Sequence, residues 1–139
     1  MRLRRKAGGS AGVARILVGT DLSPTSERAV AWAADMASRY DAELLVLQVV
    51  AERPPAAEDE LARFAEEVAG ADARTKITVA DDPAAAIVRV AQEEDVDVIV
   101  VGSVGMQGRK EFLLGNVPNR VSHSARCTVV IVDTSRNGP

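Results

Sequence analysis

Short apolar runs alternate with longer amphipathic stretches along almost the whole chain. The apolar runs predict five β-strands, at residues 14–19, 43–52, 75–80, 96–102 and 127–132. Most of these runs are nearly continuous in Val, Ile and Leu, which is typical of strands buried on both faces of a parallel sheet. The run at 75–80 instead alternates polar and apolar residues, so we expect a strand with one solvated face or a strand at a sheet edge.

Helical periodicity fills the intervals between the predicted strands. Ser23 and Asp82 are suited to cap two of the helices, because a proline follows each of them at the first helical position. The expected inward-facing residues are Val30, Ala33, Ala37 and Tyr40, then Leu61, Phe64, Ala65 and Val68, then Ile87, Val88 and Ala91, and finally Val117, Val121 and Ala125. Strand and helix therefore alternate throughout, which predicts an α/β fold with helices on both faces of a parallel sheet.

The chain is most simply one domain, because 139 residues can bury a core without disulfides. Residues 1–12 hold four of the 17 basic groups and no acid, and their Gly and Ser content predicts a flexible extension. We expect the domain to span residues 13–135, with a short tail at 136–139.

Charge and cysteine content narrow the classes of partner. Beyond residue 12 the chain carries 13 basic and 20 acidic groups, a net charge of −7, which argues against nucleic-acid binding. No apolar run approaches the length of a membrane span, so we expect no membrane partner. The single cysteine, Cys127, cannot form an internal disulfide, which fits the reducing cytoplasm.

Residues 101–122 follow the fourth predicted strand and carry four glycines. Ligands of parallel α/β sheets bind beyond the carboxyl ends of the strands, so this loop and the one after the first strand are the places to expect a site. Gly102 and Gly105 let the backbone approach a ligand, and Gly115 and Asn116 stand where free N–H groups at a helix start favour an anion. Taken alone, this pattern fits a phosphate cradle and a loop with a glycine turn about equally well.

The spacing Gly102-x2-Gly105-x9-Gly115 resembles that of the nucleotide-binding universal stress proteins, in which Ser or Thr follows the last glycine. The resemblance extends from about Ala14 to Asp133. It implies a three-layer sandwich with a five-stranded parallel sheet in the order 3-2-1-4-5, and ATP or another adenine nucleotide (AMP or cyclic AMP) across the first and fourth strands. The nucleotide-binding positions that it implies are Gly19, Thr20, Asp21, Val49, Val101, Gly102, Gly105, Gly115, Asn116 and Val117.

Within this implied site, Asp21 lies near the nucleoside and the backbone of Val49 reads the adenine edge. Asn116 departs from the family pattern, since it offers no hydroxyl to a phosphate or a metal and is about as good an N-cap as serine. A capping role is therefore favoured over a dedicated contact with a triphosphate, and we expect Mg²⁺ only if a triphosphate is bound.

Other reactive side chains have simpler interpretations. Arg109 and Lys110 are expected to be solvated, His123 to interact with a helix C-terminus, Trp32 to pack, and Cys127 to be a small buried hydrophobe. No nucleophile–base pair or acidic pair accompanies the glycine loop, so we expect no catalytic residue and no dedicated metal site.

The last predicted strand, Cys127 to Val132, would form a sheet edge and is apolar, which predicts that a second copy of the chain covers it; dimerisation there is also what the resemblance implies. We therefore expect a cytoplasmic homodimer that binds an adenine nucleotide in the stress response. The alternatives are a slow ATPase or autophosphorylating protein and a ligand-free protein-interaction dimer.

Overall fold

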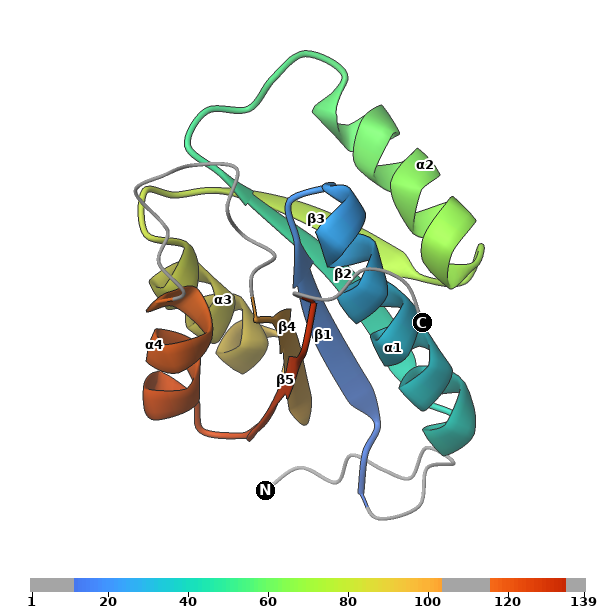
Figure 1. The fold of residues 1–139 in the computed structure, drawn as a ribbon, viewed down its shortest axis with the longest axis vertical. Coiled ribbons are helices and arrows are strands. Elements are labelled where there is room, and N and C mark those ends of the chain that lie inside the picture. Colours follow the sequence, from blue (N-terminus) through green and yellow to red (C-terminus); the bar gives the residue numbers. More distant parts are fainter. Residues whose placement is uncertain (1–11, 104–115, 135–139) are drawn as a thin grey trace.

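The computed structural model describes residues 12–103 and 116–134 of the chain. Five parallel strands form one sheet in the order β3-β2-β1-β4-β5, which confirms the expected fold (Figure 1). The strands are β1 (Arg15–Thr20), β2 (Glu43–Val50), β3 (Arg74–Val79), β4 (Val98–Gly102) and β5 (Thr128–Val132). The strand with alternating polarity is β3, and it lies at an edge of the sheet as its pattern predicted.

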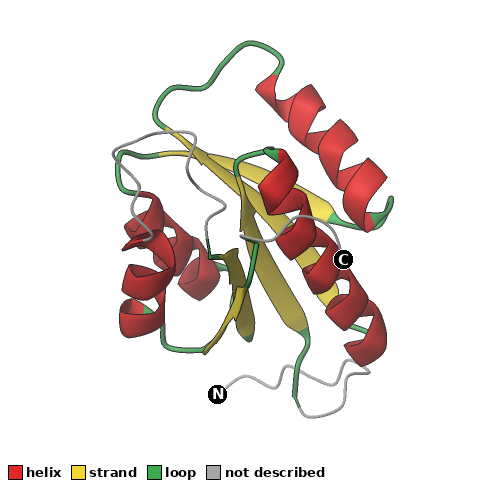
Figure 2. Cartoon of the chain, in the orientation of Figure 1, coloured by secondary structure: helices red, strands yellow, loops and turns green. Residues whose placement is uncertain are grey.

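The helices lie on both faces of the sheet (Figure 2). They are α1 (Pro24–Tyr40), α2 (Ala57–Ala69), α3 (Pro83–Glu93) and α4 (Asn116–Ser124). The α1–α2 face packs on alternate strand residues such as Ile16 and Val18, and the α3–α4 face packs on Leu17 and Ile99. The sheet is thus the middle layer between two apolar clusters, as continuous Val, Ile and Leu runs require.

The two expected helix caps are confirmed. Ser23 Oγ accepts a hydrogen bond from the backbone N–H of Ser26 at 3.2 Å, and Asp82 Oδ1 accepts one from Ala85 at 3.2 Å. Each cap satisfies an N–H group that has no partner within the helix, and the following proline fixes the first helical residue.

Asp97 fixes the start of β1 beside β4, because its Oδ2 accepts the backbone N–H groups of Ala14 and Arg15 at 2.8 and 3.0 Å.

Trp32 departs from the expectation of a packing residue, since it is 37% exposed on the surface of α1. In the described ranges, none of the helices has the length and apolar character that crossing a bilayer requires.

Candidate functional site

Three strands meet where the direction of strand order reverses, at the carboxyl ends of β1, β2 and β4. The register pairs Val18 of β1 with Val100 of β4, one residue before Gly19 and Val101. On the other side of β1, Thr20 pairs with Gln48, one residue before Val49. The structure therefore brings segments 19–21, 49–50 and 101–103 together at the carboxyl end of the sheet, although they are far apart in the sequence.

Part of the predicted site lies outside the described residues. Gly105 and Gly115 belong to this part, as do Arg109 and Lys110. For Asn116 the backbone alone is described, as the first residue of α4. Val117 follows it with 4% exposure and packs into the apolar cluster on the α3–α4 face, so its side chain anchors the start of α4.

Thr20 is fully buried, and its hydroxyl belongs to a hydrogen-bond chain within the turn between β1 and α1. The backbone N–H of Leu22 donates to Thr20 Oγ1 at 3.0 Å, and Ser26 Oγ donates to the carbonyl of Ser23 at 2.8 Å. Because the Ser26 proton is used in this way, the 2.8 Å contact between the two hydroxyls is a donation from Thr20 to Ser26. The side chain of Thr20 thus shapes the turn, and its backbone is the part that faces the candidate site at the carboxyl end of the sheet.

Asp21 is held in the same turn but keeps one oxygen available. Its Oδ1 accepts the backbone N–H of Ser23 at 3.0 Å, and its Oδ2 has no hydrogen-bond partner among the described residues. The next residue, Leu22, has φ of 68°, a left-handed conformation that a branched apolar residue rarely adopts. Such backbone strain clusters at functional sites, and here it directs the turn beside Asp21.

Gly102 has a packing reason to be glycine. A Cβ atom there would lie 2.8 Å from Cγ2 of Thr134, a side chain that is 1% exposed. Ser103 fixes this approach, since its N–H donates to Val132 O at 2.8 Å and its Oγ accepts the N–H of Thr134 at 3.1 Å. The chain after β5 therefore lies directly against the end of β4, a contact that sequence spacing did not reveal.

An ion pair joins the N-cap of α3 to the middle of α4. Arg120 donates to Oδ1 and Oδ2 of Asp82 at 2.8 and 2.7 Å, the two-pronged geometry that suits a guanidinium and a carboxylate. Hydrogen bonding to Arg120 lowers the pKa of the Asp82 carboxyl, with burial opposing it and the helix N–H groups adding to the effect. The pair links the N-cap of α3 to the middle of α4, and nothing near Arg120 in the sequence signals it.

Gln48, near the carboxyl end of β2, is a further polar residue close to the candidate site, and the sequence analysis did not single it out. Its Oε1 is buried without a hydrogen-bond partner in the described structure. The signal was available, because Gln48 is the single polar residue inside the apolar run of β2. Within the described residues, no group of three or more His, Cys, Asp or Glu side chains converges to hold a metal ion.

Known proteins resemble the chain over most of its length. The model of the universal stress protein family matches residues 12–133. A universal stress protein of Mycobacterium tuberculosis is 37% identical over 139 residues, which cover 88% of this chain and 46% of the relative. This chain thus spans about half the length of that relative. A second one from the same species is 33% identical over 144 residues, covering 86% and 96% of the two chains.

A solved structure gives the same result in three dimensions. It is a crystal structure of a universal stress protein in complex with cAMP, with 32% identity and a TM-score of 0.70 over 88% of this chain and 98% of the other. Sequence, family model and fold agree. The chain belongs to the universal stress protein family.

Proposed function

We propose that the chain binds an adenine nucleotide across the carboxyl ends of β1 and β4 and acts, as a cytoplasmic homodimer, in the stress response. The observation that carries the proposal is the meeting of Asp21, Val49 and Gly102 at the point where strand order reverses. This is where parallel α/β sheets bind ligands. The relative of 32% identity that was crystallised with cAMP supports the adenine class of ligand.

Asp21 is proposed to bind the ribose. Its Oδ1 is held by Ser23, which orients the carboxylate, and its Oδ2 remains available to accept a hydrogen bond from a ribose hydroxyl. A bond of this kind to a charged acceptor contributes on the order of 1.5–3 kcal/mol.

The adenine is proposed to lie against the end of β2. Pairing between β1 and β2 ends at Thr20 and Gln48, whereas β2 continues to Val50 beside β3. Beyond Gln48, the side of β2 that faces β1 therefore has no strand neighbour. The backbone of Val49 is the group proposed to read the adenine edge there.

The phosphates are proposed to lie between Gly102 and the start of α4, with the loop glycines Gly105 and Gly115 as backbone donors. Free N–H groups and the helix dipole favour an anion at a helix start. Asn116 supplies an amide there in place of a hydroxyl, so AMP and cyclic AMP are the alternatives to ATP, and Mg²⁺ enters only with a triphosphate.

Calorimetric titration of the purified chain with ATP, AMP and cyclic AMP tests the proposal. We expect binding of at least one of them, and Asp21→Asn should weaken it about tenfold or more because a charged acceptor is lost. The matched control is Asp59→Asn, since Asp59 is an exposed carboxylate on α2, and it should leave affinity unchanged. Absence of binding for all three nucleotides would overturn the proposal.

Two further variants test which nucleotide is preferred and whether ATP is hydrolysed. Asn116→Ser should strengthen ATP binding if the asparagine limits the contact with the terminal phosphate, and it should change nothing if Asn116 acts as a cap alone. If the chain releases phosphate from ATP and Gly115→Val abolishes this release, the function is that of a slow ATPase and not of binding alone.

A further inference from the structure

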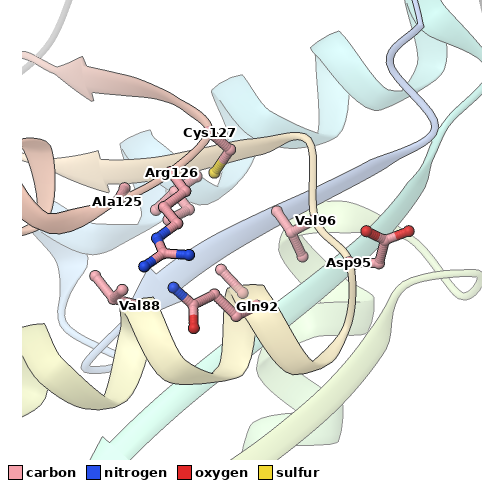
Figure 3. A pocket seen from close by; sticks show the side chains of 9 residues that line it. Val88, Gln92, Asp95, Val96, Ala125, Arg126 and Cys127 are labelled. Carbon is pink, nitrogen blue, oxygen red and sulfur yellow. The ribbon is translucent and has the colours of Figure 1, made fainter. Parts of the chain in front are cut away.

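A groove lies at the end of the molecule opposite the candidate nucleotide site. It is formed by the C-terminal half of α3, the start of β4 and the segment that joins α4 to β5 (Figure 3). Its volume is about 210 Å³, below the roughly 300–1,000 Å³ of pockets that hold nucleotides and drug-sized ligands. An occupant of this groove is therefore a smaller molecule than the proposed nucleotide.

The floor of the groove is apolar. Ala91, Val96 and Ile99 line it and are themselves almost fully buried, and Val88 and Ala125 add partly exposed aliphatic walls. An apolar cavity of about 150 Å³ is large enough to bind benzene. A groove of 210 Å³ therefore accommodates one aromatic ring with a small polar substituent.

Two donor groups stand together at one end of the groove. Figure 3 shows the guanidinium of Arg126 and the side-chain amide of Gln92 pointing toward one another. Neither side chain has a hydrogen-bond or ionic partner among the described residues. Asp95 lies at the other end, beyond Val96, where its carboxylate is 3.7 Å from Arg15 and so is already balanced by a cation.

Several carbonyl groups at the nearby helix ends already accept backbone donors. The carbonyl groups of Val90 and Ala91 at the end of α3 accept the N–H groups of Glu94 and Val96 at 2.8 and 2.9 Å. At the end of α4, the N–H of Ala125 donates to the carbonyl of Val121 at 2.9 Å. Arg126 is exposed at the rim of the groove, and it is the cation there that has no side-chain partner among the described residues.

Cys127 forms part of the wall without being a nucleophile. Burial, and secondly the nearby charge of Asp97, raise the pKa of its thiol above the ordinary value. The thiol is therefore protonated at neutral pH, and the thiolate is the reactive form. A ligand in this groove is held by non-covalent contacts.

We propose that this groove is a second ligand site, for a small aromatic carboxylate of the size of benzoate. The ring lies on Val88, Ala91 and Val96, and the carboxylate pairs with the guanidinium of Arg126 and the amide of Gln92. A planar carboxylate matches the fork of donors that a guanidinium presents.

Titration of the ¹⁵N-labelled chain with benzoate, followed by amide chemical shifts, tests this site. We expect saturable shifts in residues 88–99 and 125–127, weaker binding of neutral benzamide, and weakest binding of cationic benzylamine. Arg126→Gln should weaken benzoate binding about tenfold, because a charge-assisted hydrogen bond is lost. Arg63→Gln is the matched control, since it removes an exposed arginine on α2 that does not line the groove, and it should change nothing.

Two further variants test the charge preference of the groove and the position of the ring. Arg126→Glu should reverse the preference, so that benzylamine binds more tightly than benzoate, and Ala125→Leu should block the ring while leaving the folded spectrum intact. Shifts that map to the carboxyl ends of β1 and β4, or benzoate affinity that Arg126→Gln leaves unchanged, would overturn the proposal. Neither result depends on whether the nucleotide binds at the opposite end of the sheet.

Discussion

Gly102 lacks a side chain where a Cβ atom would approach Cγ2 of Thr134 to 2.8 Å. In the sequence, the same glycine is the first member of a spaced set that suggests a phosphate-binding loop. The two requirements act on different faces of one residue, because the Cβ would point toward Thr134 and the backbone reaches the edge of the sheet. A substitution at this position therefore changes folding as well as ligand binding.

Removing the opposing side chain separates these two effects. Gly102→Ala should lower the free energy of unfolding by about 1–3 kcal/mol, the range for overpacking a dense site. Gly102→Ala combined with Thr134→Ala should recover most of this loss, because the clashing Cγ2 is gone. Urea denaturation measures both. A single variant as stable as the natural chain would show that the end of β5 yields easily, contrary to the packing described for Gly102.

The side chain of Thr20 has a structural role that its position in the sequence did not show. Its place after the first strand made it a candidate for ligand contact, and that assignment stays a prediction for its backbone. Its hydroxyl is committed to Leu22 and Ser26 inside the turn, at 3.0 and 2.8 Å. Which side chain of a short polar turn points inward is decided by the packing of the turn.

The ends of the helices carry contacts that help to position them. The sequence identified Asp82 as the cap of α3 from the proline that follows it. It did not identify Arg120 as its partner, because the two residues are 38 positions apart and belong to different helices. The ion pair nevertheless links the N-cap of α3 to the middle of α4.

Replacing Asp82 by two different residues separates the cap from the ion pair. Asp82→Asn keeps an N-cap and loses the charge, whereas Asp82→Ala loses both and should be less stable than Asp82→Asn by about 1 kcal/mol. The free energy of unfolding in urea measures the difference. Equal stability of the two variants would show that the cap contributes nothing.

The pH dependence of the same variants checks the charge. The folded-state pKa of Asp82 is lowered, so its contribution to stability is present at neutral pH and is lost as the pH falls through that pKa. The stability difference between the natural chain and Asp82→Asn should therefore shrink on acidification, and also in high salt because the pair is exposed. A difference that stays constant from neutral to acid pH would contradict an ionic contribution.

The two outer strands of the sheet, β3 and β5, differ in chemistry. The β3 edge carries exposed Arg74 and Thr75 and a partly exposed Lys76, and charged residues protect an edge against unwanted pairing. The β5 edge is apolar, and Ile131 on it is 47% exposed. An apolar, unpaired edge of this kind supports the proposal that a second copy of the chain covers β5.

A lysine at each edge tests the dimer. Ile131→Lys should convert a dimer to a monomer, because it places a charge in the proposed interface. Val79→Lys is the matched control, since Val79 is 51% exposed on the opposite edge, and it should leave the assembly unchanged. Size-exclusion chromatography with light scattering measures both masses. A natural chain that is monomeric, or an Ile131→Lys variant that remains dimeric, would exclude this interface.

Local sequence patterns are enough to predict the order of strands and helices along the chain, the caps at Ser23 and Asp82, and the polar character of the β3 strand. These features depend on neighbours along the chain, and local periodicity and capping report such neighbours directly. The order of strands in the sheet came from the resemblance to a family and was confirmed by the structure.

Three features appear only once the chain has folded: Gly102 packs on Thr134, Asp82 pairs with Arg120, and Arg126 and Gln92 line one groove. In each case the two residues are more than thirty positions apart, so no local pattern encodes their proximity. They arise when buried strands bring distant segments to the same end of the sheet, and burial then determines which polar groups find partners there.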